Sequence, residues 1–249
     1  MPEGMKLSGR TALVTGAARR IGRAISLALA ERGVNLVLHA RNSVNEAEAL
    51  AGEVRALGVR AWIVAADLAG ARQVDSLFAR ALEAAGHVDF LINNASIFEP
   101  ATLAGFSFEE LAENVQVNAF APLQLARAFA AQGRAGAVVN ILDTRVTVYD
   151  REHIPYHLSK RMLLSLTSMM ALEYAPGVRV NAVAPGLILP PAGEDRSYLE
   201  RLASSNPLKR IGSTEDVTRA VLFLLESDFV TGEVVFVDGG YHLKGRMYE

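Results

Sequence analysis

Hydrophobic residues follow two alternating patterns along this chain. Short, nearly continuous apolar runs predict buried strands, and longer stretches with apolar residues on one face predict helices. The predicted strands are 10–15, 35–39, 59–67, 87–96, 137–142, 178–186 and 232–240. The predicted helices are 24–33, 44–57, 71–86, 107–131, 155–174 and 214–227.

This regular alternation predicts an α/β fold with one doubly wound parallel sheet. The sequence has no linker, internal repeat or low-complexity tract, so residues 1–249 are predicted to form a single domain. A hydrophobic fraction of 51% suits one large core. Only the segment 187–210 departs from the pattern, with its prolines and mixed charge. We interpret residues 187–207 as a substrate lid rather than an ordinary surface excursion.

Composition and charge exclude several classes of function. The formal net charge is −2 and no segment is strongly basic, so nucleic acid is not an expected partner. No apolar run reaches the roughly 18–20 residues of a membrane span, and residues 1–10 lack the apolar core of a signal peptide. We therefore expect a cytoplasmic protein that does not bind membranes. The absence of cysteine excludes disulfides, thiolate metal sites and cysteine nucleophiles, and we expect no metal.

Chemistry-bearing residues cluster where the predicted strands end, which is the edge at which α/β sheets bind ligands. The first strand leads through Gly16 to Gly22 and a helix, an arrangement that binds nucleotide phosphates at free helix N–H groups. Arg19 and Arg20 add two cations, which are costly side by side without an anion. By itself, such a glycine turn often only links a strand to a helix.

The second strand ends without the acidic residue that usually binds the ribose 2′-hydroxyl of NAD. After His39 the chain continues with Arg41, Asn42 and Ser43, which suit a 2′-phosphate. This pattern favours NADP over NAD. The alternative is a solvated loop.

Two further strand ends carry polar groups with more than one interpretation. Asp67 could accept from the adenine amino group or cap the helix 71–86. Asn94 and Ala95 could lie close to a cofactor or form an ordinary asparagine turn. Phe98, in the loop that follows, could stack on a flat ligand or anchor the loop to the core.

The strongest candidate for catalysis is the pair Tyr156 and Lys160, which share one face of a predicted helix. A phenol has an ordinary pKa of about 10. An adjacent ammonium lowers that pKa and allows proton exchange near neutrality. Asp143 lies at the tip of the strand before this helix. Alone, the pair also fits an amphipathic helix with an extended lysine.

Together these motifs resemble the short-chain dehydrogenase/reductase family along nearly the whole chain. They occur in the family's order as TGAARRIG (15–22), Asp67–Leu68, NNAS (93–96), Asn118, YHLSK (156–160), PG (185–186) and VDGG (237–240). The resemblance implies a Rossmann fold with strand order 3-2-1-4-5-6-7. It also implies a nicotinamide cofactor and usually a homotetramer.

Two departures narrow the resemblance. Arg20 replaces a glycine of the usual turn, and Asp143 replaces the serine that most members carry thirteen positions before the tyrosine. Both departures are similar to the pteridine reductase branch, which includes the bacterial dihydromonapterin reductases. That branch also has an aromatic residue after NNAS, which Phe98 matches.

The resemblance implies roles for particular residues. Arg20 and Ser96 would contact cofactor phosphate and pterin, Phe98 would stack the pterin on the nicotinamide, and Asn118 would place a water behind Lys160. The predicted catalytic residues are Asp143, Tyr156, Lys160 and Asn118, and the predicted substrate-binding residues are Arg20, Ser96, Phe98, Asp143 and Tyr156. The predicted cofactor-binding residues are Gly16, Arg19, Arg20, Ile21, Gly22, His39, Arg41, Asn42, Ser43, Asp67, Leu68, Asn94, Ala95, Ser96, Tyr156, Lys160, Pro185, Gly186, Leu187 and Ile188.

An aspartate at position 143 makes chemical sense for a pterin. A serine hydroxyl suits a carbonyl substrate because it donates to a developing alkoxide. A pterin needs a proton on a ring nitrogen, which a carboxyl group beside Tyr156 can relay or orient. The carboxylate would raise the pKa of Tyr156 against the effect of Lys160, and two such close acids titrate as a pair. The alternative is drift from serine with loss of function.

Three functions remain open from the sequence. The first is NADPH-dependent reduction of dihydropterins, with dihydrofolate as a possible second substrate. The second is an NADP-dependent carbonyl reductase acting on a 3-oxoacyl group, sugar or alcohol. Arg20 argues against this function, because carbonyl reductases of the family normally keep a glycine at that position. The third is a non-catalytic nucleotide-binding protein, which would not need the pair of Tyr156 and Lys160.

Overall fold

The computed structural model describes residues 6–191 and 193–246. Residues 1–5, 192 and 247–249 lie outside the described residues. All of them belong to the predicted domain 1–249, and residue 192 also belongs to the predicted lid 187–207. Seven parallel strands form one sheet in the order β3-β2-β1-β4-β5-β6-β7, which confirms the predicted doubly wound α/β fold. The strands are β1 Thr11–Val14, β2 Asn35–Ala40, β3 Ala61–Ala65, β4 Phe90–Asn93, β5 Gly136–Ile141, β6 Val178–Pro185 and β7 Val234–Val237.

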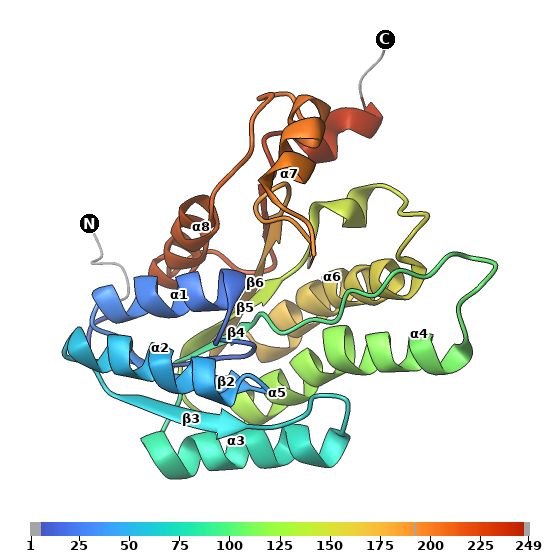
Figure 1. The fold of residues 1–249 in the computed structure, drawn as a ribbon. Coiled ribbons are helices and arrows are strands. Elements are labelled where there is room, and N and C mark those ends of the chain that lie inside the picture. The colour runs from blue at the N-terminus through green and yellow to red at the C-terminus, as the bar shows by residue number, and fades with distance from the viewer. Residues whose placement is uncertain (1–5, 192, 247–249) are drawn as a thin grey trace.

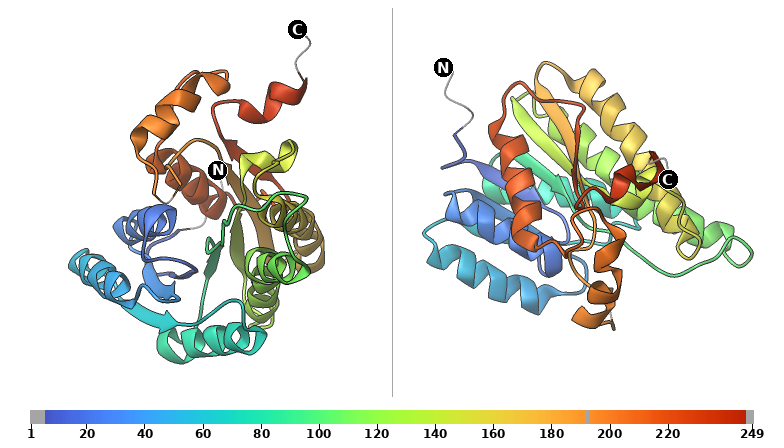
Figure 2. Two further views of the ribbon diagram at one scale, coloured as in Figure 1. Left: turned by 45° about the vertical axis from the view of Figure 1, so that its right-hand side comes forward. Right: turned by 90° about the horizontal axis from the view of Figure 1, so that it is seen from above.

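Helices cover both faces of the sheet (Figures 1 and 2). Helices α1, α2 and α8 pack together on one face, and α3, α4, α5 and α6 pack on the other. The helices are α1 Arg20–Glu31, α2 Val44–Ala56, α3 Ala71–Ala85, α4 Phe108–Val115, α5 Ala121–Ala130, α6 Ile154–Tyr174, α7 Arg196–Leu202 and α8 Thr214–Glu226. Shorter turns of 3₁₀-helix cover Thr144–Thr147, Ala203–Ser205 and Tyr241–Arg246.

The core is divided by the sheet into two main hydrophobic clusters. On β4, Phe90 and Ile92 point into the cluster under α1 and α8, while Leu91 points into the cluster under α3 and α5. Successive side chains of a strand alternate between faces, so a strand covered on both sides must be apolar at every position. This is why the buried strands could be recognised as continuous apolar runs.

The observed helices differ from the predicted helices in three respects. Helix α1 begins at Arg20 and not at residue 24, so its first free N–H groups lie directly after the glycine turn. The predicted helix 107–131 consists of α4, a π-helical turn over Gln116–Phe120, and α5. The segment after β6 contains the short helix α7. Helix α8 begins at Thr214 as predicted, and its N-cap is Ser213, whose hydroxyl accepts from the Asp216 N–H.

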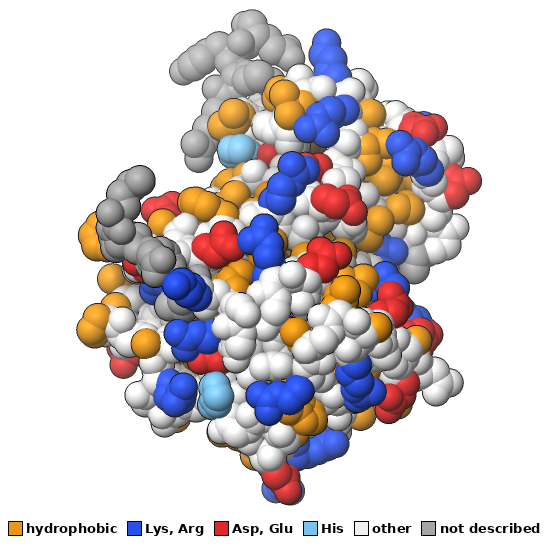
Figure 3. Space-filling view, turned by 90° about the vertical axis from the view of Figure 1, so that its left-hand side faces the viewer, with side chains coloured by type: hydrophobic (Ala, Val, Ile, Leu, Met, Phe, Trp, Pro, Cys, Tyr) orange, Lys and Arg blue, Asp and Glu red, His pale blue; other side chains and the backbone are white. Residues whose placement is uncertain are grey.

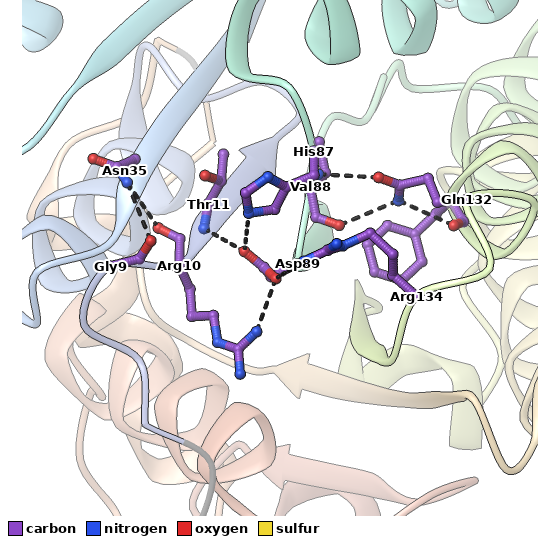
Figure 4. Close-up of polar contacts among 10 residues, drawn as sticks. Gly9, Arg10, Thr11, Asn35, His87, Val88, Asp89, Gln132 and Arg134 are labelled. Atoms are coloured by element: carbon purple, nitrogen blue, oxygen red, sulfur yellow. Dashed lines mark hydrogen bonds and ion pairs between the residues drawn. The ribbon is translucent and has the colours of Figure 1, made fainter.

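A polar cluster holds β1 and β4 together at their amino ends, opposite the edge where the predicted site lies (Figure 4). Asp89 is buried and accepts from the Thr11 N–H at 2.9 Å and from Arg10 Nη1 at 3.0 Å. His87 Nε2 and Arg134 Nη2 lie 3.3 Å and 3.9 Å from its carboxylate. The cluster is therefore part of the scaffold and not of the site.

Acidic and basic side chains are intermixed on the face formed largely by α1, α2 and α8 (Figure 3). Exposed ion pairs join these helices, from Arg23 to Glu53 at 2.7 Å and from Arg32 to Glu226 at 2.8 Å. Such pairs contribute little to stability because solvent screens them. Among the described residues, no helix has the length and apolar character needed to cross a membrane.

Candidate active site

The carboxyl ends of β1 to β6 surround a cavity of about 620 Å³. Every predicted substrate-binding residue lines it, as do all the predicted cofactor-binding residues except two. The two exceptions are Asn42 and Ser43; Ser43 instead precedes α2 as its N-cap. Asn118, predicted to be catalytic, does not line the cavity either.

The glycine turn has a tight and internally bonded conformation. Gly16 adopts a positive φ of 62°, and a Cβ on Gly22 would come within 2.1 Å of the Gly16 carbonyl oxygen. The Asn94 side chain donates to the carbonyls of Thr15 and Gly16 at 2.9 Å and 3.1 Å. Asn94 therefore supports the turn with its side-chain amide; it also lines the cavity, and its contact with a cofactor remains a prediction.

The two arginines of this turn both have protein partners. Arg19 pairs with Glu46, and Arg20 Nη2 donates to the Pro190 carbonyl at 2.6 Å. Arg19 therefore has an anionic partner within the protein, and the contact of both arginines with a cofactor remains a prediction. Arg20 has a positive φ of 55°, which glycine adopts without cost, and this explains why the related position is commonly glycine.

His39 links the glycine turn to the neighbouring strands. Its Nδ1 accepts from the Gly16 N–H at 3.1 Å, and its Nε2 lies 3.0 Å from the Ala66 carbonyl oxygen, to which it donates. These two contacts require a neutral imidazole with the proton on Nε2. Burial lowers the pKa of His39 and keeps it in that form.

The end of β2 has no acidic residue, and Arg41 lines the cavity beside it. The Arg41 Nη1 lies 4.0 Å from Asp67 Oδ1 on the next strand. Asp67 accepts from the Ala69 N–H, and the N-cap of α3 is Gly70, so the helix-cap alternative for Asp67 is wrong. Arg41 is exposed and can meet a phosphate at this end of the cavity.

Asn118 connects the loop after β4 to helix α6. It is fully buried in the π-helical turn, and its Oδ1 accepts from the Ser96 hydroxyl and the Ile97 N–H. Its Nδ2 donates to Ser159 Oγ at 3.0 Å, one residue before Lys160. Asn118 thus positions two walls of the cavity, and its predicted role toward a water remains a prediction.

The tyrosine and the aspartate are directly joined. The Tyr156 hydroxyl donates to Asp143 Oδ2 at 2.9 Å, and the Arg145 N–H donates to Asp143 Oδ1 at 2.7 Å. Burial, followed by the charge of Asp143 and its hydrogen bond, holds the pKa of Tyr156 well above its usual value. Arg145 offsets part of this rise. The expectation that Lys160 lowers this pKa is therefore wrong in this structure.

Lys160 is buried, and its ammonium is bonded to the backbone. Its Nζ donates to the Ile141 carbonyl at 2.8 Å and lies 5.7 Å from the centre of the Tyr156 ring. Burial lowers the pKa of Lys160 to about 8, although Asp143 opposes this effect. The ammonium form therefore predominates at neutral pH.

Comparison with known proteins agrees with this arrangement. A family model described as enoyl-(acyl carrier protein) reductase matches residues 16–242. A short-chain type dehydrogenase/reductase of Picea abies is 35% identical, over 94% of this chain and 93% of the relative. The chain belongs to the short-chain dehydrogenase/reductase family. It is an oxidoreductase of that family, as the sequence predicted.

Members of this family with different substrates are similar to the chain. The 3-oxoacyl-[acyl-carrier-protein] reductase FabG of Staphylococcus aureus is 32% identical, over 96% of this chain and 100% of the relative. The solved structure of FolM alternative dihydrofolate reductase 1 from Brucella canis, complexed with NADP, superposes with a TM-score of 0.91. Its sequence is 34% identical, and the match covers 98% of this chain and 97% of that one. The similarity therefore supports the family without selecting one of its branches.

One side of the cavity contains residues that the sequence patterns did not single out. Phe98 stacks on His153, with ring centres 4.0 Å apart and planes at 14°, and its ring meets Tyr156 edge-on at 4.7 Å. Arg145 lies 5.5 Å from the Phe98 ring centre and pairs with Asp150 at 2.5 Å. His153 thus covers one face of the ring predicted to stack a pterin. The sequence signal was DTR at 143–145 followed by DREH at 150–153.

The segment after β6 contributes another wall of the cavity. Leu187, Ile188, Leu189 and Pro191 line it, together with Tyr198 and Leu199 of α7. The Gly212 N–H donates to the Leu187 carbonyl at 3.0 Å, so both ends of this segment are anchored to each other.

Proposed function

We propose that this oxidoreductase reduces dihydropterins to tetrahydropterins with NADPH, and that dihydrofolate is a second substrate. The observation that carries the proposal is the hydrogen bond from Tyr156 to Asp143 inside the cavity. A carboxyl group at this place supplies or orients a proton for a ring nitrogen. The similarity to a FolM alternative dihydrofolate reductase supports the same reaction.

The residues present fit NADP(H). The free N–H groups at the start of α1 suit a pyrophosphate, and Arg41 suits a 2′-phosphate at a strand end that has no acid of its own. The similar FolM structure is complexed with NADP. When bound, NADPH supplies a hydride to the carbon of the pterin C=N bond.

The protein supplies the accompanying proton. Each turnover consumes one proton, which goes to the ring nitrogen of the reduced bond. Tyr156 keeps its proton at neutral pH because burial and Asp143 raise its pKa, so the pair can donate rather than abstract. Lys160 keeps a positive charge under the pair and is placed to hold the ribose hydroxyls.

We further propose that residues 187–207 act as the substrate lid. Their support is the apolar wall that this segment adds to the cavity and the bond from Arg20 to the Pro190 carbonyl. This bond connects the glycine turn to the segment. Ser96 and Phe98 then border the substrate from the opposite side.

The second candidate function is reduction of a 3-oxoacyl thioester. The identity of 32% to a FabG reductase favours it. In that case Asp143 would take the role of the serine hydroxyl, which donates a hydrogen bond to the developing alkoxide. A carboxylate has no proton to donate to a developing alkoxide, whereas in pterin reduction Asp143 can act by orienting the proton that Tyr156 carries, and this is the physical argument against the alternative.

The test is NADPH oxidation with dihydrobiopterin, dihydrofolate and a β-ketoacyl thioester, using wild type and two variants. Wild type should reduce the pterin. Asp143→Ser should lose most of that activity, and Tyr156→Phe should reduce kcat by about 10²–10⁴ while the Kd for NADPH stays the same. Turnover of the thioester alone, or an unchanged pterin rate in Asp143→Ser, would contradict the proposal. NADPH binding without turnover would favour a non-catalytic role.

We also propose that the chain forms a homotetramer, as its family resemblance implies. Helix α6 supports this because it carries a row of exposed apolar side chains. These are Leu158, Met162, Met169 and Leu172. Exposed apolar rows of this kind commonly mark contacts between subunits.

A further inference from the structure

Arg145 places a positive charge at the substrate end of the cavity. Its side chain is 31% exposed and lines the cavity beside Asp143 and Phe98. Lys160, the other cation near Tyr156, is buried behind the pair and bonded to a backbone carbonyl. Arg145 is thus a cation beside Asp143 and Phe98 that a substrate can touch.

The guanidinium of Arg145 is held in place from one side only. Its Nη1 donates to Asp150 Oδ2, and the side chain of Asp150 is 7% exposed. Asp150 Oδ1 accepts from the N–H groups of Glu152 and His153 at 2.8 Å and 3.2 Å, and Oδ2 also faces His153 Nδ1. Within residues 6–191 and 193–246, no protein group accepts from Arg145 Nη2 or Nε. These N–H groups are available to a ligand.

The neighbours of Arg145 define what kind of ligand fits. Asp143 offers carboxylate oxygens as acceptors, Arg145 offers donors, and Phe98 offers an apolar ring whose centre lies 5.5 Å from the guanidinium carbon. A flat heterocycle with an N–H group and an acceptor atom on one edge can use both charged groups. A β-ketoacyl thioester has carbonyl acceptors near its reacting carbon but no ring N–H for Asp143.

We propose that Arg145 is a specificity-determining residue, whose guanidinium donates to a carbonyl oxygen or ring nitrogen on the edge of a flat heterocyclic substrate. Asp143 accepts from an N–H group of the same edge, and Asp150 acts as a positioning residue that fixes the guanidinium. This inference rests on the proposed function, since it identifies how that site distinguishes a pterin from a thioester. The charges of Asp143 and Asp150 raise the pKa of Arg145 against the lowering effect of burial, so the guanidinium stays charged.

The experiment measures the Kd of oxidised biopterin for the complex with NADP⁺, which binds the ligand without turnover. Arg145→Met should weaken this binding about tenfold or more, the usual effect of losing a hydrogen bond to a charged group. The matched control is Arg151→Met, because Arg151 is exposed and lies outside the cavity lining. Its Kd for biopterin should equal that of wild type, and the Kd for NADP⁺ should be the same in all three proteins.

Steady-state kinetics give a second readout. In Arg145→Met the KM for dihydrobiopterin should rise more than kcat falls, whereas a merely structural defect would also weaken NADP⁺ binding. Arg145→Lys keeps the charge but loses the planar fork, and should bind biopterin several-fold more weakly than wild type. Asp150→Asn should also bind biopterin several-fold more weakly than wild type, because the substitution removes the charge that holds the guanidinium of Arg145 in place. If Arg145→Met does not fold, as loss of NADP⁺ binding would reveal, these two variants decide the matter.

The outcomes separate this inference from the proposed function. Wild-type affinity for biopterin in Arg145→Met, or in both Arg145→Lys and Asp150→Asn, would overturn the inference and leave pterin reduction standing. A wild type that neither binds biopterin nor reduces dihydrobiopterin would overturn both. Equal weakening in Arg151→Met would show a general charge effect and would also overturn the role of Arg145.

Discussion

At Tyr156, burial and a neighbouring carboxylate act in the same direction. Both raise its pKa, and the partly exposed Arg145 offsets only some of the effect. Asp143 therefore keeps the phenol protonated, which suits proton donation during a reduction. The sequence predicted that Asp143 raises this pKa against the effect of Lys160. The rise is observed, and Lys160 is not among its main opposing causes, because spacing on a helix does not show where the end of a long side chain lies.

His39 provides a pH-dependence prediction at the same scale. Its pKa is lowered by burial below the ordinary value of about 6.5, so the unfolded chain takes up this proton more readily than the folded chain. The free energy of unfolding should therefore fall as the pH drops from about 6.5 towards the folded pKa. A protonated Nδ1 can no longer accept the hydrogen bond from the Gly16 N–H. Because this bond holds the glycine turn, NADPH binding should weaken over the same pH range.

Urea unfolding and the Kd for NADPH at pH 7.5 and 5.5 would check this prediction. The matched variant is His39→Asn, whose Oδ1 can replace Nδ1 as the acceptor but does not titrate. Its pH dependence should be smaller than that of wild type, with the remainder coming partly from His157, whose pKa is also lowered by burial. An identical dependence in both proteins would exclude His39 as the source.

At the scale of elements, polar side chains join strands and loops that the sequence could only place separately. Asn94 ties the end of β4 to the turn after β1, and Asn118 ties the loop after β4 to α6. The sequence singled out both residues, although Asn118 lies in a π-helical turn and Asn94 follows β4 instead of lying within it. It could not predict their partners, because these come from distant segments.

Asp89 carries a stability prediction for the scaffold. Asp89→Ala removes the acceptor for the Thr11 N–H and leaves Arg10 without its partner, and should lower the free energy of unfolding by about 2–3 kcal/mol. The carboxylate is buried while its arginine partners are about half exposed, so we attribute most of the loss to the backbone N–H. Urea denaturation would measure the effect.

The matched control for this prediction is Asp75→Ala, because Asp75 is exposed on α3. It should change the free energy of unfolding by no more than about 0.5 kcal/mol. NADPH affinity should be nearly unchanged in both variants, since the cluster lies at the amino edge of the sheet (Figure 4). Equal stability of the two variants would show that the Asp89 cluster contributes little.

At the scale of the whole molecule, one continuous sheet carries all the strand ends that form the cavity. Strands β1 and β4 are neighbours at its centre, where the chain reverses its direction of winding and opens a crevice. The segment after β6 returns to this crevice and closes one side of it. Residues far apart in sequence therefore reach one site without any second domain.

The proposed assembly gives a prediction at this scale. Light scattering should report four times the mass of the chain for wild type. Leu172→Glu, which adds a charge to the exposed apolar row of α6, should reduce that mass because a charge is costly in an apolar interface. Leu57→Glu, an equally drastic change at an exposed site after α2, is the control and should keep the wild-type mass. A monomeric wild type would exclude the tetramer.

The sequence by itself determined the order of strands and helices, the glycine turn, and the common helix face of Tyr156 and Lys160, while the family resemblance implied that Asp143 lies beside Tyr156. These follow from local periodicity and from motifs that occupy the ends of strands, and both are visible in a single chain. Only the tertiary structure decided that Arg145 lines the cavity, that His39 is neutral, and that Arg19 and Arg20 have protein partners. Side-chain direction, burial and ion pairing depend on contacts between segments that folding brings together, and no local pattern encodes them.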